Sequence, residues 1–580
     1  MKITKILCLA LSLLFVLSAL AGCNTEGQTD STDSSGESNS PESEKIVEFI
    51  DVVKDGVAIN VIYPAFSTAA EVKTANGIVT SIKNLSGVVA RTKMEPASYD
   101  ASTVEIVVGN TEYPASQKVM KELGYAEGII EIVGNKIIIL ANDEECYDTL
   151  ATRFAIAMSS GKDKNKNIRI AGDYNIHVSE NELVASIPVI SGRSPDYVKD
   201  AGNGSYVLMF ENADTSVVNS YLSVLKAEGY TEYAKSKLEN NYFYTYTNEE
   251  NAVTVMLTDY DKEMKVIVDS LSDTALPTRE SDNKWTAASG MTTTISQLGL
   301  YYDGDFNGMS YVIRLADGSF IVIDGGHGKT ENAARLYNVM KKQAPDPNKI
   351  VIAAWFFTHG HSDHTGFFKS FGEKYASKVT VEQFVYNFPS GDELTGADEC
   401  GADGSVGKYF KKVPVVKAHA GQEFYIRNSK ITMLYTNDLW VYGDQALETA
   451  NEASLVFSVE LEGKKFMVLG DYYDDVGILR NLYTAKTLKS DIMQVSHHGI
   501  SNCGSALYPI IAPEWALWPL GTDYVEEYDR VISDHRINAY MKTMNKNKVF
   551  MAKDDIVILT LANGSISAQV FDTDEIYLTS

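Results

Sequence analysis

A short segment rich in metal-binding side chains follows a long apolar run, and it constrains the fold more than any other feature of this sequence. The apolar run 350–357 predicts a buried β-strand, and the next residues include His359, His361, Asp363 and His364. The 580 residues contain only nine histidines, so three within six positions are improbable by chance. Imidazole nitrogen and carboxylate oxygen are ligands of zinc-class metals. The sequence therefore predicts a metal centre at a strand end.

A loop can direct alternate side chains to two neighbouring metal positions. We expect His359 and His361 to bind one ion, and Asp363 and His364 to bind a second. Asp363 is then also a predicted catalytic residue, because two adjacent cations activate a water molecule and stabilise developing negative charge.

A second strand-like run lies upstream, where Asp317-Gly318 predicts a hairpin, and its second strand ends in Asp324-Gly325-Gly326-His327. Asp324 is expected to orient a ligand histidine rather than to bind metal, as carboxylates commonly do around metal-bound imidazoles. His327 and His535 are candidates for protonating a leaving group, and a surface or packing role is an equally open interpretation of both.

The order of four motifs resembles the metallo-β-lactamase superfamily. The motifs are Asp324-Gly325-Gly326, the segment 358–366, Leu469-Gly470-Asp471 and Val495-Ser496-His497-His498-Gly499. The resemblance is strongest to the branch that contains the hydrolase domain of the bacterial DNA-uptake channel protein and the phosphorylcholine esterases. It covers about residues 292–578 and implies an αββα sandwich over 290–580. It also implies that Asp471 bridges the two ions and that either His497 or His498 is the last ligand, a choice that the sequence leaves open.

One departure from the family pattern concerns the first ion. Most members supply a further histidine between the main motif and the bridging aspartate, just before a strand. Here that place holds Asn451, which we assign a supporting position beside the metal, and the strand 455–459 follows it. The only histidine in the interval is His419, at a place where the DNA-uptake branch has a turn. The first ion then has fewer protein ligands, and we expect it to be more open or more weakly bound.

The N-terminus has the pattern of a bacterial lipoprotein signal over residues 1–23. Two lysines precede a short apolar run that ends in Leu20-Ala21-Gly22-Cys23. A transmembrane helix is the alternative, but the apolar run is short for a bilayer. The resemblance implies that Cys23 is lipidated. We therefore expect a protein anchored on the outer face of the cytoplasmic membrane, with the polar segment 24–45 as a flexible linker.

Two smaller units are predicted between this linker and the metal-binding domain, which makes the chain an α/β multidomain protein. Residues 46–180 alternate strand and helix patterns and resemble an accessory domain of secreted glycoside hydrolases. Residues 181–285 predict a small α+β unit. Its tyrosine-rich run 242–246 is more typical of an ordinary strand, and glycan contact by these N-terminal domains is the alternative.

Net charge limits the class of substrate. The formal charge of -26 makes extended nucleic acid an unlikely partner, because a polyanion repels it. We therefore expect an envelope-anchored hydrolase that uses a metal-bound hydroxide on a small or cell-envelope phosphoester. Two divalent ions are expected as cofactors, zinc first, with manganese and iron also compatible. The alternatives are a nuclease for short or single-stranded DNA and a glycan-binding lipoprotein with a vestigial hydrolase domain.

Overall fold

The structure is a computed structural model that describes residues 48–572, with gaps at 97, 180, 191–192, 203, 303–304, 307, 390–402, 441–446, 448, 474–476, 501–505, 522–535 and 553–554. It is a mixed α/β protein with several sheets. The predicted lipidation site Cys23, the predicted linker and His535 lie outside the described residues. None of the helices in the described part has both the length and the apolar character of a membrane span.

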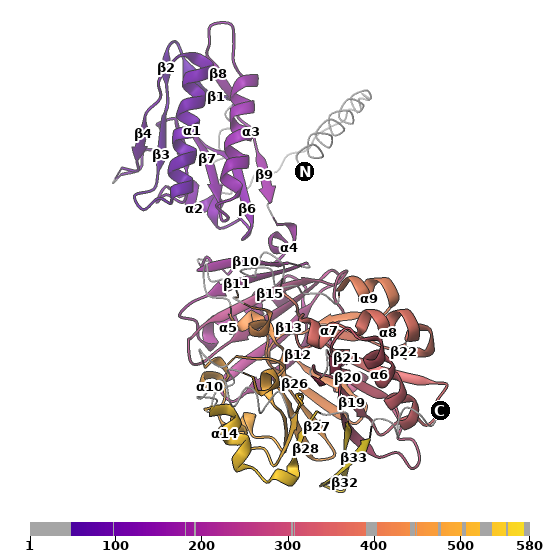
Figure 1. Cartoon of the computed structure of the whole chain (residues 1–580). Helices are drawn as coiled ribbons and strands as arrows, with labels where there is room; N and C mark the ends of the chain where they lie inside the picture. The colour runs from indigo at the N-terminus through magenta and orange to yellow at the C-terminus, as the bar shows by residue number, and fades with distance from the viewer. Residues whose placement is uncertain are drawn as a thin grey trace, which may run out of the picture. The chain divides into compact units, whose positions relative to one another are not determined.

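Residues 48–179 form a six-stranded sheet in the order β4-β3-β5-β7-β6-β9, with a small three-stranded sheet of β2, β1 and β8. A reciprocal capping box between Thr68 and Glu71 begins α1, and Gly87 in the left-handed conformation ends it. Helices α1 and α3 lie side by side (Figure 1). The elements are β1 (Phe49–Lys54), β2 (Val57–Ala58), β3 (Asn60–Tyr63), α1 (Ala69–Ser86), β4 (Thr92–Met94), β5 (Glu105–Val108), α2 (Pro114–Met120), β6 (Glu127–Val133), β7 (Lys136–Ala141), α3 (Cys146–Ser160), β8 (Ile168–Ala171) and β9 (Ile176–Ser179).

Residues 197–270 form a six-stranded antiparallel sheet in the order β10-β11-β15-β14-β13-β12. Successive side chains of a strand point to opposite faces, so Tyr242, Tyr244 and Tyr246 pack in the apolar core beneath α5, whereas Phe243 belongs to a different core. The elements are α4 (Glu182–Ala185), β10 (Tyr197–Gly202), β11 (Ser205–Phe210), α5 (Thr215–Ala227), β12 (Thr231–Leu238), β13 (Asn241–Thr247), β14 (Asn251–Leu257), β15 (Met264–Ser270) and η1 (Glu280–Asp282).

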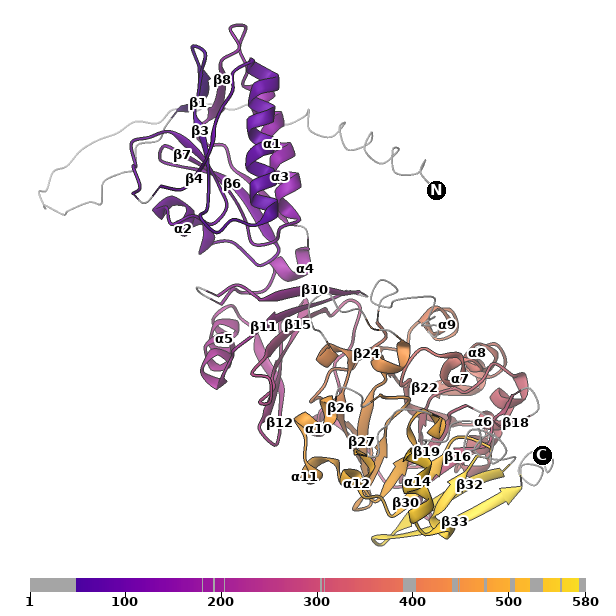
Figure 2. The ribbon, with the colours of Figure 1, turned by 60° about the vertical axis from the view of Figure 1, so that its left-hand side comes forward.

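Residues 293–572, here called the C-terminal domain, contain two large sheets with an apolar core between them. One sheet has the order β24-β23-β21-β20-β19-β16-β32-β33, with β22 also paired to β21, and the other has the order β25-β26-β27-β28-β29-β30-β31. Helices α6 and α8 cover the outer face of the first sheet. Figure 2 shows α7 and α8 on one side of this domain and the β32–β33 hairpin at its edge. The outer face of the second sheet packs against its own helices and against the 197–270 sheet.

The elements of the C-terminal domain include the expected hairpin around Asp317-Gly318 and the expected strands before His359 and after Asn451. The first half contains β16 (Thr293–Leu298), β17 (Tyr301–Tyr302), β18 (Asp305–Phe306), β19 (Tyr311–Arg314), β20 (Phe320–Ile323), α6 (Thr330–Gln343), β21 (Ile350–Phe356), α7 (Ser362–Thr365), α8 (Phe368–Tyr375), η2 (Ala376–Lys378), β22 (Val379–Val381), β23 (Phe384–Tyr386), α9 (Asp403–Tyr409), β24 (Val415–Lys417), β25 (Glu423–Ile426) and β26 (Ser429–Tyr435). The second half contains η3 (Asn437–Trp440), η4 (Ala450–Ala453), β27 (Val456–Leu461), β28 (Lys464–Val468), α10 (Ile478–Leu482), α11 (Ala485–Leu488), β29 (Ile492–Gln494), η5 (Ser496–Gly499), α12 (Tyr508–Ile511), β30 (Trp515–Trp518), α14 (Arg536–Thr543), η6 (Lys546–Lys548), β31 (Val549–Met551), β32 (Asp555–Ala562) and β33 (Ser565–Asp572).

Four strand ends position the candidate site. β20 and β21 are parallel neighbours in one sheet, and β28 and β29 are parallel neighbours in the other. The chain leaves these strands toward Asp324, His359, Asp471 and His498, respectively. The carboxyl ends of parallel neighbours lie at the same edge of a sheet, so loops far apart in the sequence meet there.

Candidate metal centre

Ligand-type side chains gather in two groups that share Asp471. The first group contains His359, His361 and Asp471, and the second contains Asp363, His364, Asp471 and His498. In each group the ligand atoms lie within 4.8 Å of one another. The structure therefore brings the motif residues together in the pairs expected from the sequence, and it places His498 rather than His497 in a group.

The second group has spacings that match a metal coordination shell. His364 Nε2 lies 3.2 Å from His498 Nε2 and 3.1 Å from Asp471 Oδ1, and His498 Nε2 lies 3.1 Å from Asp363 Oδ2. Ligand atoms held tetrahedrally around zinc, with metal–nitrogen bonds near 2.0–2.1 Å, are about 3.3 Å apart. Three side chains are almost completely buried, and Asp363 is partly exposed. The geometry fits one divalent ion.

The hydrogen bonds on the outer ring nitrogens strengthen this fit. His498 Nδ1 lies 2.9 Å from the carbonyl oxygen of Pro519, and His364 Nδ1 lies 2.7 Å from Asp324 Oδ2. A carbonyl oxygen and a carboxylate accept hydrogen bonds, so each Nδ1 donates, and each Nε2 offers a lone pair to a metal ion once it has lost its proton. The two Nε2 atoms lie 3.2 Å apart, and Asp471 Oδ1 lies 3.1 Å from His364 Nε2. A cation between them converts a repulsive arrangement into ligation.

Electrostatics point the same way. Burial by itself lowers the pKa of His498, but the carboxylates of Asp471 and Asp363 outweigh burial and raise it to about 10. Burial by itself raises the pKa of Asp471, but His364 and His498 hold it well below its ordinary value. The centre thus concentrates negative charge that requires positive partners. Protons and metal ions compete for the same ring nitrogens.

The first group is smaller and more open. His359 Nε2 lies 3.1 Å from His361 Nδ1 and 3.8 Å from Asp471 Oδ2, and His361 is partly exposed. Burial lowers the pKa of His359 well below its ordinary value, which keeps its ring neutral and able to bind metal. These three donors leave at least one position of a tetrahedral ion for water or substrate.

Asn451 occupies η4, directly before β27, as the comparison of motifs predicts. Its side chain is buried, its Nδ2 donates to the Tyr473 hydroxyl at 3.2 Å, and its Oδ1 has no hydrogen-bond partner among the described residues. The Tyr473 ring lies beside the His497 ring, with centroids 5.3 Å apart. A supporting role for Asn451 beside the first group stays a prediction, and its unsatisfied amide oxygen is a suitable donor for a hard cation.

Asp324 connects two of the motif loops. Its carboxylate accepts hydrogen bonds from the Thr358 backbone N–H and hydroxyl, both at 2.7 Å, and it lies 2.7 Å from His364 Nδ1. Asp324 therefore orients a ligand-type histidine, in the manner expected from the sequence. A close backbone approach also holds the loops together, since a Cβ at Gly366 would lie 2.2 Å from the Ser362 carbonyl oxygen and 2.7 Å from Gly328 N.

His497 and His498 follow β29 in an unusual backbone conformation. Their φ angles are 45° and 54°, in the left-handed region that non-glycine residues rarely adopt. Two hydrogen bonds hold this turn, from His497 N to the Gly470 carbonyl at 3.1 Å and from Trp518 Nε1 to the His498 carbonyl at 2.6 Å. His498 Nε2 consequently reaches the second group, whereas the His497 side chain is 18% exposed with Nε2 3.8 Å from Asp471 Oδ2.

The remaining candidate histidines have different positions. His327 is buried near the main motif. Gly308 lies between the two, since a Cβ at Gly308 would be 3.3 Å from His327 Cδ2 and 3.0 Å from the Asp363 carbonyl oxygen. Its role as an acid stays a prediction, and His535 lies outside the described residues. His419 is not part of either group and pairs with Asp269 and Asp438 instead.

Several supporting residues were not identified from the sequence. Thr358 precedes the motif and holds Asp324, the Pro519 carbonyl orients His498, and Tyr473 connects Asn451 with His497. Thr358 and Tyr473 lie within two residues of a motif ligand, so their place in the sequence could have identified them as candidates. Pro519 has no such signal, because a backbone carbonyl carries no mark in the sequence.

Comparison with known proteins assigns the C-terminal domain to a class. Residues 303–472 match the model of the metallo-β-lactamase superfamily. The chain therefore contains a metallo-β-lactamase superfamily domain, which confirms the expected superfamily and the mixed α/β class. No curated protein is detectably similar in sequence.

Similar solved structures share little sequence with this chain. CmlA, a diiron β-hydroxylase from Streptomyces venezuelae, is 12% identical, with a TM-score of 0.24 over 42% of this chain and 40% of CmlA. A mutant of CmlA aligns over 55% of its own length, so the chain spans about half of that protein. Zinc-bound PqqB from Methylobacterium extorquens is 11% identical, with a TM-score of 0.23 over 35% of this chain and 71% of PqqB. A metallo-β-lactamase from Cronobacter sakazakii is 12% identical, with a TM-score of 0.23 over 41% of this chain and 79% of that chain.

Proposed function

We propose that this protein is a metal-dependent hydrolase of phosphoesters or phosphodiesters. The observation that carries the proposal is the pair of donor groups that share Asp471. Two divalent cations held there would supply an activated water molecule near neutral pH and stabilise negative charge on the substrate. Zinc is the first metal to test, followed by manganese and iron, because imidazole and carboxylate ligands accept all three.

The protein's own residues have distinct tasks in this proposal. Asp324 and the Pro519 carbonyl fix the orientation of His364 and His498, so these ligands need no reorganisation when substrate arrives. Burial lowers the pKa of His497, which keeps its partly exposed ring neutral near neutral pH. His327, close to the loop of Asp363, is our candidate for protonating the leaving group.

The phosphoester class is supported by two features of the motifs. The ending His497-His498-Gly499, and Asn451 in place of a further histidine, both resemble the phosphodiesterase-like branch. The formal charge of -26 disfavours long nucleic acid. We therefore propose a small or cell-envelope phosphoester as the substrate.

Anchoring at the envelope is a separate part of the proposal. It is supported by the sequence that ends in Leu20-Ala21-Gly22-Cys23, where lipidation of Cys23 would hold the protein on the outer face of the cytoplasmic membrane. Detergent extraction of cells that express the wild type or Cys23→Ser tests this, because the Cys23→Ser protein should lose its partition into the detergent phase.

The enzymatic proposal is tested with bis-p-nitrophenyl phosphate and metal analysis on the purified protein. We expect stoichiometric divalent metal and a hydrolysis rate that Asp363→Ala abolishes. Asp346→Ala, which removes an aspartate outside both donor groups, is the matched control and should retain the wild-type rate. A protein without bound metal whose Asp363→Ala variant hydrolyses the ester equally well would contradict the proposal and support a glycan-binding protein with a vestigial domain.

The substrate class is tested by assaying a lactone and single-stranded DNA beside bis-p-nitrophenyl phosphate. A small-phosphoester hydrolase should depend weakly on salt, whereas cleavage of DNA should fall steeply as salt rises, because binding neutralises several phosphates. Strong single-stranded DNA cleavage at low salt would replace the proposed substrate by short nucleic acid.

A further inference from the structure

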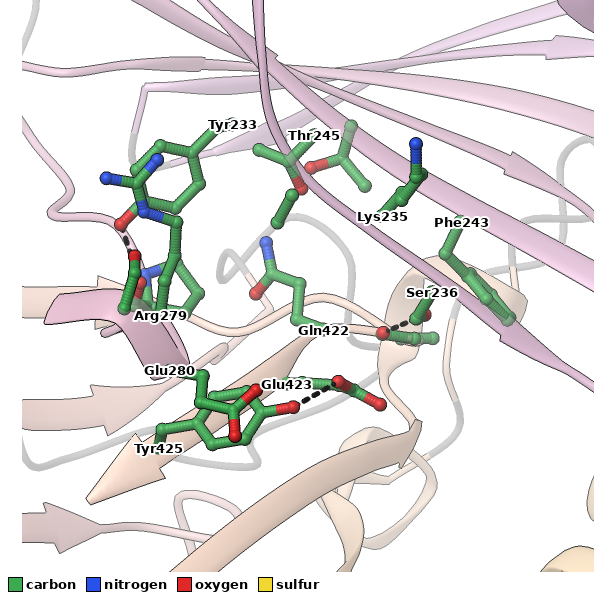
Figure 3. Close-up of a pocket in the computed structure, with 16 residues that line it drawn as sticks. Tyr233, Lys235, Ser236, Phe243, Thr245, Arg279, Glu280, Gln422, Glu423 and Tyr425 are labelled. Atoms are coloured by element: carbon green, nitrogen blue, oxygen red, sulfur yellow. Dashed lines mark hydrogen bonds between the residues drawn. The ribbon is translucent and has the colours of Figure 1, made fainter. Parts of the chain in front are cut away.

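A cavity with a volume of about 270 Å³ lies away from the metal centre, where strands β12, β13 and β14 meet the turn of residues 420–423 (Figure 3). None of its lining residues belongs to the two donor groups of the metal centre. Its walls combine aromatic rings with hydroxyl and amide groups, contributed by Tyr233, Phe243, Tyr425, Thr245, Thr254 and Gln422.

The walls of this cavity are held by the fold itself. Gly421 has a φ of 80°, and a Cβ at this position would lie 1.9 Å from the Phe243 ring, so the turn packs directly on that ring. Ser236 Oγ donates to the Gly421 carbonyl at 2.5 Å, and the Tyr233 hydroxyl donates to the Pro277 carbonyl at 2.7 Å. A cavity with fixed walls binds a ligand at low entropic cost.

One polar group in the cavity is left unsatisfied. Thr254 lies on β14 with its side chain 1% exposed, and its hydroxyl has no hydrogen-bond partner within the described part of the chain. A buried hydroxyl without a hydrogen-bond partner is unfavourable, and a ligand hydroxyl would supply that partner. Gln422 Oε1 accepts from His419 N at 3.0 Å, and Figure 3 shows the amide nitrogen of Gln422 directed into the space below Thr245. Thr254 therefore lines the same cavity into which the Gln422 amide nitrogen is directed.

The cationic groups that line the cavity are already paired, and the Glu280 carboxylate lines it as well. Lys235 lies 2.9 Å from Glu232, Arg279 lies 2.7 Å from Asp282, and Glu423 lies 2.8 Å from Lys430. The Arg279 guanidinium also covers the Tyr233 ring, 4.5 Å from its centroid. A ligand therefore meets no unpaired cation there, which disfavours phosphates and other anions and favours a neutral molecule.

We propose that this cavity binds a single neutral sugar ring, as a glycan subsite separate from the metal centre. The C–H faces of a sugar ring pack on aromatic side chains such as Tyr233 and Tyr425, and its hydroxyl groups pair with Thr254 and Gln422. The volume is near the lower end of ligand pockets, about 300 Å³, which accommodates one ring. Strand β13 contributes Phe243 and Thr245 to the cavity, while the tyrosines of β13 pack on the opposite face of the sheet.

The test is saturation-transfer NMR on the purified protein with glucose, galactose and N-acetylglucosamine. We expect transfer from at least one sugar with a Kd of about 1–10 mM, the range of a single small ring. Thr254→Val should weaken this binding tenfold or more without lowering the melting temperature, because it removes only an unpaired hydroxyl. Tyr221→Phe is the matched control: it removes another buried unpaired hydroxyl, on α5 outside the cavity, and should leave sugar binding unchanged.

Three results would overturn this inference. The first is the absence of transfer from all three sugars, and the second is sugar binding that survives both Thr254→Val and Tyr425→Ala. The third is binding of adenosine in the same cavity in preference to every sugar, which would assign it to a nucleobase. Removing metal with a chelator should leave sugar binding intact, so the outcome is independent of the proposed hydrolase activity.

Discussion

The described residues contain two clusters of buried histidine and aspartate, and the clusters differ in how their ring nitrogens are satisfied. His419 lies between Asp269 and Asp438, with each ring nitrogen 2.8 Å from a carboxylate oxygen. In the metal centre, His364 and His498 each have one nitrogen satisfied from outside and direct the other at each other. The first cluster is complete with one proton on each ring nitrogen, whereas the second needs a cation.

The comparison shows that composition alone does not identify a metal site. Both clusters are buried, and the pKa of both His419 and His498 is raised to about 10 because facing carboxylates outweigh burial. The convergence of two rings distinguishes them, because the Nε2 atoms of His364 and His498 lie 3.2 Å apart, whereas His419 is a single ring between two carboxylates. His419 connects β15 with η3, whereas the two converging rings of the metal centre can bind a metal ion when it displaces their Nε2 protons.

The largest expected effect comes from Asp471, which both donor groups share. Asp471→Asn removes a negative charge from both positions, and we expect hydrolysis to fall by at least about 10²–10³-fold together with loss of metal measured by mass spectrometry. Asp346→Asn is the control. Full metal content in Asp471→Asn would show that the shared carboxylate does not ligate, and would remove the main difference between the two clusters.

The next effect separates the adjacent histidines. His498→Ala should lower the affinity of the second ion by more than about 100-fold, because it removes a direct ligand and exceeds the usual effect of a supporting residue. His497→Ala should leave metal content close to wild type and affect mainly the hydrolysis rate. If His497→Ala lost metal and His498→Ala kept it, the turn after β29 would present His497 to the ion in the metal-bound protein.

The His419 cluster should respond in stability and not in metal content. His419→Gln leaves two buried carboxylates without a cationic partner, at a cost of about 3–5 kcal/mol in the free energy of unfolding, measured by urea denaturation. Loss of metal in this variant, with stability unchanged, would contradict the distinction between the clusters.

The wild-type cluster also has a predictable pH dependence. The carboxylates of Asp269 and Asp438 outweigh burial and raise the pKa of His419 from 6.5 to about 10. The charged form is therefore favoured in the folded state, and its contribution to stability is complete below pH 6.5 and is lost as pH rises through about 10. His419→Gln should show no such loss over that window.

The smallest expected effect concerns Asn451. Asn451→His adds an imidazole where other members of the superfamily have one, and we expect the first ion to bind about tenfold more tightly. Asn451→Ala should weaken it, with Asn547→Ala on η6 as an amide control away from the ligands. Equal metal affinities in all these variants would show that Asn451 does not face the first ion.

Much of the metal centre could be predicted from the sequence, because its ligands occur in short motifs next to strand ends. The strand before His359 and the hairpin before Asp324 are both present in the structure. The choice between His497 and His498 could not be made, because both are the same residue type and only the left-handed turn decides which ring nitrogen joins the second group. The sugar cavity was equally out of reach, since its two walls lie about 180 residues apart in the chain.

By itself, the sequence determined the superfamily of the C-terminal domain, and it predicted the ligand-type residues and their division between two groups. These properties depend on residue types at short spacing, which local chain geometry preserves. Only the tertiary structure decided which ring nitrogens converge, that His419 completes a cluster with Asp269 and Asp438, and that Phe243 and Gly421 build a cavity. These properties depend on the orientation of side chains from distant segments, which is set when the sheets pack against each other.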